Sequence, residues 1–390
     1  MTKDSLRSFS VRVMADGAVI LVQTSVPLLA LKFGASPVLL GVIGWAAMAV
    51  RLPFCLAAGS LSDRYGRKIV AVPAAVLFVL ASAGVGFSQS NLALLVFYTL
   101  LMVANGTFHP PLQSFIGDIS ARGQLARNVG ASNFGWVGGI ALTIFALGWL
   151  VDKSLRLPPF IAAVFSIVAL VIMVTWRKPQ DIKPDVDSNS TPPPAANPRV
   201  LLASRIGHFL GFTGFAIIVI LFPKLGQYLG WTDKAIAQTV AAMRGGVALG
   251  ILAANLYPWW RGKFWPQPLA QALMLLFGII GALSSRQLVL SIAFCGVGAT
   301  LGIAYTSAMY HGLSGRLKMG KNSGIHESLV SLANITGCLI GGVLAQAFTP
   351  RAPFVFFCVL VAFGLVATAA VRYTADRSAA RTACKTPLVP

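Results

Sequence analysis

The sequence predicts an all-α polytopic membrane protein with twelve transmembrane helices in two pseudo-symmetric six-helix bundles. Three observations lead to this fold class. Of the 390 residues, 56% are hydrophobic and only 11% are charged, with a mean hydropathy of +0.76, which is unlike the composition of soluble domains. Apolar segments of about 20 residues, long enough to cross a bilayer, recur along the chain. The two halves of the chain also match each other weakly.

Charged residues, prolines and glycines separate the apolar segments and set their limits. The predicted spans are 9–32, 37–61, 69–88, 91–118, 127–151, 157–176, 200–225, 233–257, 266–284, 287–311, 322–348 and 352–373. Between the sixth and seventh spans the chain is polar and rich in proline, so it cannot form a packed core there. The predicted domains are an N-terminal bundle over 1–176, a cytoplasmic linker over 177–199, a C-terminal bundle over 200–373 and a cytoplasmic tail over 374–390.

The distribution of basic residues predicts the orientation. With both termini on one side, that side carries 21 of the 31 Lys and Arg residues, the opposite loops carry seven, and three fall within spans. Because cytoplasmic loops are enriched in Lys and Arg, we expect a multi-pass protein of the plasma membrane, the inner membrane in a bacterium, with both termini in the cytoplasm. The net charge of +20 is scattered between spans, so no nucleic-acid partner is expected.

The sequence offers little for catalysis. It has five cysteines but no CxxC pair, so neither a disulfide framework nor a zinc site is indicated. No GxxxxGK[ST] nucleotide-binding motif is present, and the one Glu and ten Asp residues form no paired carboxylates. We therefore expect no enzyme activity, no cofactor and no metal.

A weak internal repeat relates the two halves of the chain. At an offset of 196 residues the following pairs align in order: Pro27 with Pro223, Gly34 with Gly230, Gly66 with Gly262, and Gly106 with Gly302. Six-helix halves related by an axis along the membrane normal are an architecture of transporters, in which the solute site lies between the halves near the bilayer midplane.

The stretch GSLSDRYGRK, residues 59–68, concentrates charge between the second and third spans. Its pattern of Gly, three residues, Asp-Arg, one residue and Gly-Arg-Lys resembles the signature of the major facilitator superfamily at this position. The matching residues are Gly59, Asp63, Arg64, Gly66, Arg67 and Lys68. Together with the twelve spans, the linker and the repeat, the resemblance covers nearly the whole chain, and it implies the fold and the alternating-access transport of that family.

Physical reasons explain part of this charged turn. Glycine supplies the positive φ that a tight turn needs, and basic residues contact anionic lipid headgroups. Asp63 is different, because the helix dipole disfavours an acid at a helix C-terminus. The resemblance implies that Asp63 locks the halves together at the cytoplasmic face, with Arg67 paired to an acid at the end of the fourth span, where Asp118 lies. We call Asp63, Arg67 and Asp118 the charged latch, and we expect it to gate transport rather than bind solute.

Ionisable groups inside spans are costly and need a reason. Arg12, Asp16 and Gln23 share one face of the first span. Asp16 has two interpretations, an ion pair with Arg12 or Arg51 and a protonatable group that couples solute to H⁺. Glu327, near the predicted start of the eleventh span, could likewise cap that helix or carry a proton or solute.

Two arginines near mid-membrane are candidates for binding an anion. Arg51 and Arg244 lie in helices that the repeat relates, and guanidinium groups match carboxylate or phosphate oxygens. The alternative is that each pairs with Asp16, Glu327 or backbone carbonyls. His109 is a further substrate-binding candidate together with Gln23, because Pro110 and Pro111 are expected to break the fourth helix and line a cavity.

The sequence departs from the drug/H⁺ antiporters of the same family. The glycine-rich segments 135–139 and 337–342 are similar to their glycine-proline motif, but Trp136 and Cys338 stand in place of the proline. Met102 occupies the position of their arginine in the fourth helix. These differences disfavour a drug/H⁺ antiporter of the usual kind.

The function expected is secondary active transport of a small solute by alternating access, coupled to H⁺, with an organic or inorganic anion as the preferred solute. The expected partners are the solute, H⁺ and the lipid bilayer, and the chain is expected to be a monomer. Two alternatives stay open. One is an efflux antiporter for lipophilic compounds or lipids, and the other is a membrane sensor that does not transport.

Overall fold

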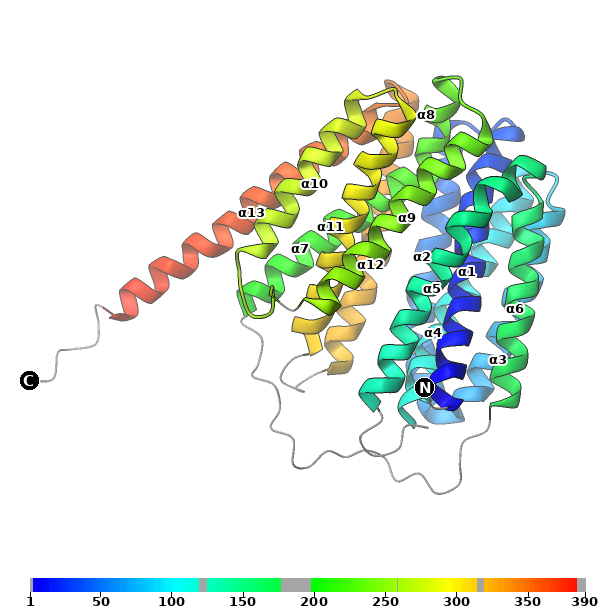
Figure 1. Cartoon of the computed structure of the whole chain (residues 1–390), viewed down its shortest axis with the longest axis horizontal. Helices are drawn as coiled ribbons and strands as arrows, with labels where there is room; N and C mark the ends of the chain where they lie inside the picture. The colour runs from blue at the N-terminus through cyan, green and yellow to red at the C-terminus, as the bar shows by residue number, and fades with distance from the viewer. Residues whose placement is uncertain (1–2, 119–124, 177–197, 258, 314–318, 384–390) are drawn as a thin grey trace, which may run out of the picture.

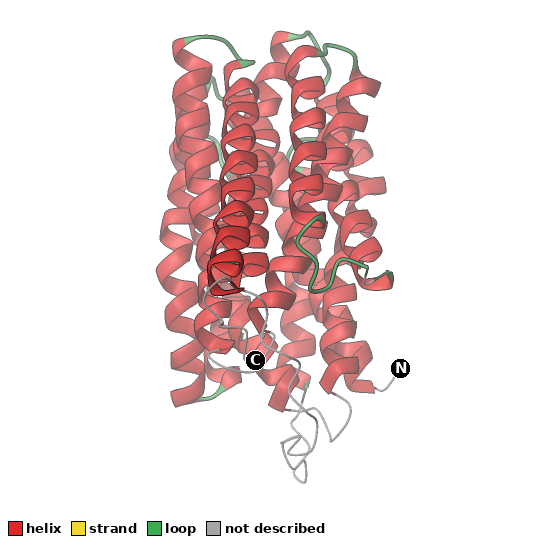
Figure 2. Cartoon of the chain, turned by 90° about the vertical axis from the view of Figure 1, so that its left-hand side faces the viewer, coloured by secondary structure: helices red, strands yellow, loops and turns green. Residues whose placement is uncertain are grey.

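The computed structural model describes residues 3–118, 125–176, 198–257, 259–313 and 319–383. All regular structure in these ranges is helical, and Figures 1 and 2 show long helices that run side by side. The helices are α1 Lys3–Lys32, α2 Pro37–Tyr65, α3 Arg67–Phe87, α4 Asn91–Asp118, α5 Leu125–Lys153, α6 Leu157–Thr175, α7 Pro198–Ala216, the π-helix η1 Ile217–Leu221, α8 Phe222–Tyr228, α9 Asp233–Leu256, α10 Pro266–Leu283, α11 Gln287–Leu313, α12 Met319–Ala347 and α13 Ala352–Ala383.

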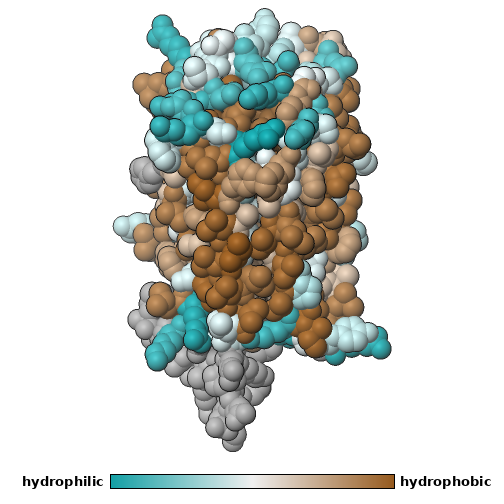
Figure 3. Space-filling model, turned by 90° about the vertical axis from the view of Figure 1, so that its right-hand side faces the viewer, coloured by the Kyte–Doolittle hydropathy of each residue, from teal (hydrophilic) through white to brown (hydrophobic). Residues whose placement is uncertain are grey.

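The predicted fold class is confirmed. In the described ranges, eleven helices are long and apolar enough to cross a membrane, and the number is twelve when α5, whose two parts are bent by 42°, counts as one span. A broad apolar band crosses the visible face of the molecule between polar ends (Figure 3). Such a band is the surface that hydrocarbon requires.

The seventh predicted span differs from a simple helix. It consists of α7, η1 and α8, and the N–H of Phe222 donates to the carbonyl oxygen of Ile217, five residues back. Pro223 follows directly and has no N–H to donate. The inserted π turn shifts the hydrogen-bond register just before this proline, and such single-turn insertions are the usual form of π-helix.

Two predicted boundaries also moved. Helix α13 continues to Ala383, past the predicted end of the last span at 373, because residues 374–383 are rich in Ala and Arg, which are strong helix formers. The predicted linker 177–199 lies outside the described residues up to 197, and its last two residues begin α7. The division into two bundles and a linker therefore stays a prediction.

The backbone repeats the internal symmetry that the sequence suggested. Among the described glycines, four have a positive φ: Gly34 at 75°, Gly66 at 101°, Gly230 at 75° and Gly262 at 70°. They form two pairs, each 196 residues apart. Ser36 and Thr232 are also 196 residues apart, and each caps the following helix by accepting a hydrogen bond from the backbone N–H three residues on. The repeat is therefore clear in the turns, where a positive φ requires glycine for steric reasons.

We call α1–α6 the N-terminal half and α7–α13 the C-terminal half. They pack closely where α2 begins and α12 ends, which we call the closed side. A Cβ atom on Gly41 of α2 would overlap the carbonyl oxygen of Cys338 in α12 and lie 3.1 Å from the Cα of Gly342. Only glycine allows two helix backbones to approach so closely in a membrane.

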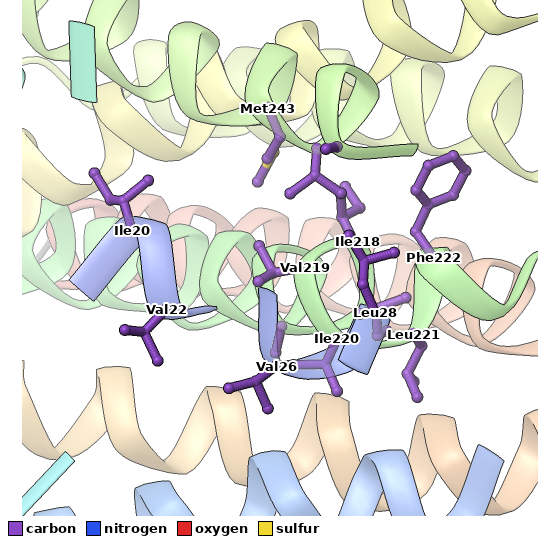
Figure 4. Packing of buried hydrophobic residues seen from close by; sticks show 14 of the residues in the cluster. Ile20, Val22, Val26, Leu28, Ile218, Val219, Ile220, Leu221, Phe222 and Met243 are labelled. Atoms are coloured by element: carbon purple, nitrogen blue, oxygen red, sulfur yellow. The ribbon is translucent and has the colours of Figure 1, made fainter. Parts of the chain in front are cut away.

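An apolar layer fills the space between the halves on this side. Val26 of α1 is 0% exposed and Ile220 of η1 is 5% exposed, and Figure 4 shows Val219 and Ile220 next to Val26. No polar group in these side chains could replace the hydration shell of a solute or ion. The layer therefore blocks passage through the closed side, as hydrophobic constrictions do in channels.

The substitution Gly41→Ala is expected to loosen the closed side. The added methyl group has no room against α12, so the unfolding temperature should fall. The Cys338 thiol, 1% exposed, should react faster with maleimide in a variant whose other cysteines are serine. Gly59→Ala is the control in the same helix, because nothing lies within 4 Å of its Cβ position, and it should not lower the unfolding temperature. Equal melting of the two variants would contradict this account of the packing.

Candidate functional site

A cavity of about 170 Å³ lies between the two halves. Both halves supply charged side chains to its wall, namely Arg12, Asp16, Arg51, Arg244 and Glu327. The apolar layer on the closed side begins about one helical turn beyond Gln23, which also lines the cavity. The polar lining of the cavity therefore ends where the apolar layer begins.

Arg12, Asp16 and His109 form a compact cluster inside the N-terminal half. Arg12 Nε lies 3.0 Å from Asp16 Oδ2, one helical turn along α1. Arg12 Nη1 is 2.7 Å from His109 Nδ1, and His109 Nε2 is 3.5 Å from Asp16 Oδ1. Because a guanidinium group can only donate, Nδ1 must accept, which places the imidazole proton on Nε2, toward Asp16. Of the two interpretations of Asp16, this geometry shows the ion pair with Arg12.

Helix α4 is not broken at His109. It runs through Pro110 and Pro111 as far as Asp118, so the expected break is absent. Prolines are tolerated in transmembrane helices because neighbouring groups satisfy the freed carbonyls. His109 still lines the cavity, but it does so from a continuous helix and as a partner of Arg12.

Arg51 connects the two halves. Its Nε donates to Asn105 Oδ1 at 3.0 Å within the N-terminal half. Its Nη1 donates to Ser331 Oγ at 3.2 Å, and its Nη2 to Glu327 Oε2 at 3.0 Å, both in α12 of the C-terminal half. The three nitrogens of one guanidinium thus donate hydrogen bonds to side chains of both halves.

The capping interpretation of Glu327 is wrong. Helix α12 begins at Met319, about two turns before Glu327, so this carboxylate is too far from the unpaired N–H groups of the first turn. Asn105 and Ser331 were not singled out from the sequence. Asn105 had a usable signal, since it is a polar amide in the middle of an apolar span.

Arg244 has a different environment. It is 4% exposed, its Nη2 donates to Gln23 Oε1 at 3.1 Å, and its Cζ lies 5.2 Å from the ring centroid of Phe215. Among the described residues, no carboxylate lies within 4.0 Å of it, and its Nε has no hydrogen-bond partner. Arg244 is thus a buried cation without an acidic partner in the described part of the chain.

Aromatic side chains complete the cavity. The rings of Trp136 and Tyr305 come from opposite halves and are 5.0 Å apart. Behind Tyr305, the buried rings of His208 and His326 stack at 4.2 Å and 22°. Phe212 and Phe215 also line the cavity. Tyr305 was missed in the sequence because an aromatic residue in an apolar span gives no distinguishing signal.

The charged turn is seen only in part. Gly66 has the positive φ expected of the turn, Arg67 Nη1 donates to Ser62 Oγ at 2.9 Å, and Lys68 Nζ donates to the carbonyl oxygen of Val174 at 2.9 Å. The side chains of Asp63 and Asp118 lie outside the described residues, so the charged latch stays a prediction.

The fold and the cavity together define a membrane transporter rather than an enzyme. Two repeated helical halves enclose a polar cavity, which apolar side chains close on one side. The chain belongs to the Major Facilitator Superfamily, whose sequence profile matches residues 9–269.

Known relatives agree with this assignment. The chain is 25% identical over 326 residues to "Multidrug resistance protein 1" of Bacillus subtilis, covering 80% of this chain and 82% of that protein. It is 31% identical over 160 residues, 40% of this chain and 37% of the other, to a "Probable 4-methylmuconolactone transporter" of Cupriavidus pinatubonensis. Among solved structures, a bacterial homologue of the human lysosomal transporter Spinster, in an inward-facing and occupied conformation, superposes with a TM-score of 0.72 at 17% identity over 96% of both chains.

The cluster around Asp16 makes a prediction about stability. In Asp16→Ala, Arg12 becomes a buried cation without its carboxylate, which should lower the free energy of unfolding by about 3 kcal/mol. In the double variant Arg12→Met/Asp16→Ala, both charges are gone and most of the loss should be recovered. Denaturant titration of the purified protein measures both values, and a double variant no more stable than the single one would contradict the pairing.

Proposed function

We propose that the protein is an H⁺-coupled secondary transporter of small organic anions that works by alternating access. Arg244 carries this proposal. A buried guanidinium without an acidic partner among the described residues is unfavourable in hydrocarbon, and a carboxylate solute would supply the missing charge. The fork of an arginine is suited to bind such a group through two parallel hydrogen bonds.

The balance of charge in the cavity supports an anion. Among the described residues, its wall contains three arginines and two carboxyl groups, which gives a formal net charge of +1 when His109 is neutral. An organic cation would add to this charge, whereas a monovalent anion would neutralise it. Coulomb interactions are strong in a cavity of low dielectric, so a net positive charge of the cavity favours an anionic solute.

The aromatic wall supports an organic solute. Phe215 lies against Arg244, and the rings of Trp136 and Tyr305 contact each other in the cavity wall, so a bound carboxylate would have apolar rings beside its carbon skeleton. A fully hydrated inorganic anion gains little from such surfaces. The relative described as a probable 4-methylmuconolactone transporter also supports a small organic molecule.

The positions of the contacts support alternating access between the two proposed bundles, 1–176 and 200–373. The described contacts between the halves lie at the cavity or on the closed side, including Val38 N–H to Gln346 Oε1 at 3.3 Å and Lys234 to Asp152 at 3.2 Å. If the basic loops are cytoplasmic, the closed side faces outward and the structure represents an inward-facing state. We place this monomer in the plasma membrane, the inner membrane of a bacterium, with both termini in the cytoplasm.

Export of lipophilic compounds is the second candidate. It is favoured by the aromatic lining of the cavity and by relatives described as multidrug resistance proteins. The two candidates differ in their need for Arg244, because an apolar solute has no group for this cation to bind.

Arg244→Ala should weaken binding of a carboxylate solute by roughly ten- to a hundredfold, the value of a lost charge-assisted hydrogen bond. The solute is first chosen by a thermal-shift screen of carboxylates, phosphates, organic cations and neutral amphiphiles, and its uptake is then measured in proteoliposomes. Arg244→Lys should keep part of the affinity.

The matched control for this experiment is Arg286→Ala, which removes an exposed arginine far from the cavity and should bind and transport normally. Unchanged uptake of anions by Arg244→Ala would refute the anion proposal. Efflux of a neutral lipophilic dye that does not depend on Arg244 would instead favour the second candidate.

Asp63→Asn tests the charged latch. If Asp63 stabilises the outward-open state by closing the cytoplasmic side, the variant should shift the equilibrium toward the inward-open state and slow transport. Accessibility of single cysteines on the two sides of the membrane measures the shift. Retention of both the wild-type accessibility and the wild-type rate would show that no such latch operates.

A further inference from the structure

We infer that Glu327, and not Asp16, is the group that takes up the coupled proton, and that Glu327 and the carboxylate of the solute compete for Arg51. The inference rests on the proposed function and assigns its coupling step to a particular pair of side chains. The observation behind it is that the described part of the cavity wall has two carboxylates, Asp16 and Glu327, and that of these two Glu327 alone is bonded across the two halves.

Asp16 makes its contacts within one half. Both of its described partners, Arg12 and His109, belong to the N-terminal half, and its side chain is 11% exposed. A proton on Asp16 would change the stability of α1 and α4 but would break no contact between the halves. A site that does not distinguish the two states of a carrier cannot shift the equilibrium between them.

Glu327 differs in both respects. It accepts from Arg51 Nη2 across the interface between the halves at 3.0 Å, and its side chain is 34% exposed toward the cavity that it lines. A proton from water in the cavity can therefore reach it. Once protonated, it no longer offers Arg51 a negative charge, and an interaction between the halves is weakened.

Competition follows from the geometry of Arg51, which lines the same cavity as Arg244. Its Nε is held by Asn105, while its Nη1 and Nη2 face Ser331 and Glu327. Glu327 therefore occupies the place on this guanidinium that the carboxylate of a solute would take if it is bound by Arg51 as well as by Arg244. Protonation removes the negative charge of Glu327, so that a solute carboxylate can replace it as the partner of Arg51. Binding of the anion and binding of the proton then favour each other, and this mutual effect is by linkage equal in both directions.

The charges agree with co-transport of one proton with one anion. The proton converts the Glu327 carboxylate to a carboxylic acid, Arg51 remains a guanidinium, and the solute adds one negative charge. The formal net charge of the cavity is then +1 with both ligands bound, the same as when it is empty. The two states that must reorient across the membrane thus carry equal charge, whereas a proton alone would raise it to +2, which low-dielectric surroundings disfavour.

Other ionisable groups surround Glu327 and will modulate its protonation. They are Arg12 and Asp16 from α1, Arg51 and Cys55 from α2, His109 from α4, Tyr305 from α11 and the adjacent His326 on α12. Arg205 and His208 from α7 lie next to His326 and act through it. Arg51 is the one that bonds to the Glu327 carboxylate directly, and Arg51 is also the group that the solute would bind.

The first experiment needs no solute. Spin labels are placed at Lys153 and Arg286, which are exposed positions on the closed side of the two halves, in a protein whose cysteines are replaced by serine. Two distances between the labels are expected, one for each state of the carrier. In the wild type, lowering the pH from 8 to 5 should change the ratio of the populations of these two distances at least threefold. Glu327→Gln should give the low-pH distribution at every pH, and Asp16→Asn should respond to pH as the wild type does.

Results that would overturn the inference are equally definite. They are a wild type that does not respond to pH, a response that persists in Glu327→Gln, or a response that is lost in Asp16→Asn. If Asp16→Asn fails to fold, Arg12→Gln/Asp16→Asn replaces it, since this pair leaves no unpaired charge on either residue.

A second experiment uses ¹⁴C-benzoate, a small aromatic carboxylate, in proteoliposomes. Glu327→Gln should exchange benzoate in counterflow at a rate within about threefold of the wild type but should lose all accumulation driven by a pH gradient. Accumulation that survives in this variant would refute the assignment of Glu327. If the wild type moves no carboxylate of any kind, the proposed function fails, while the spin-label experiment still decides which carboxyl group responds to protons.

Discussion

The requirement that a charge buried in a membrane must have a partner organises this protein. The three arginines described in the cavity differ in how far they meet it, and Arg244 has only a neutral partner among the described residues. Arg12 is paired with Asp16 inside one half, whereas Arg51 and Arg244 reach across to Glu327 and Gln23 in the opposite half. Because these side chains cross the interface, the relative position of the two halves depends on which partners are charged. A change of protonation or of bound solute can therefore become a movement.

Close backbone packing makes such a movement discrete. Glycines let α2 and α12 touch on the closed side, and the apolar layer of α1 and η1 fills the remaining space. Packed surfaces of this kind do not deform gradually, since a gap of even one ångström forfeits much of the contact energy. The halves are expected to be either in full contact on this side or separated, which is the behaviour that an alternating carrier needs.

Much of the fold could be predicted because it depends on local signals. Hydropathy gave every span, and the turn glycines gave the repeat, since hydrocarbon thickness and positive φ leave little choice of residue. The partners of Asp16 and Arg51 could not be chosen from the sequence, because several charges lie at similar depth and only packing decides between them. The unbroken helix at Pro110 and the π turn before Pro223 were missed for a related reason, as neighbouring helices determine how a membrane helix accommodates proline.

Because of the π turn, the apolar layer depends on the number of residues in 217–221 as well as on their composition. Each residue of an α-helix rotates the next by about 100°, so the additional residue in 217–221 sets the angle at which α8 leaves the core. Deleting one residue there would keep every side chain apolar yet turn Phe222 and Leu225, both fully buried, away from their present neighbours. Insertions and deletions in this segment would consequently be selected against even where substitutions between Val, Ile and Leu are freely accepted.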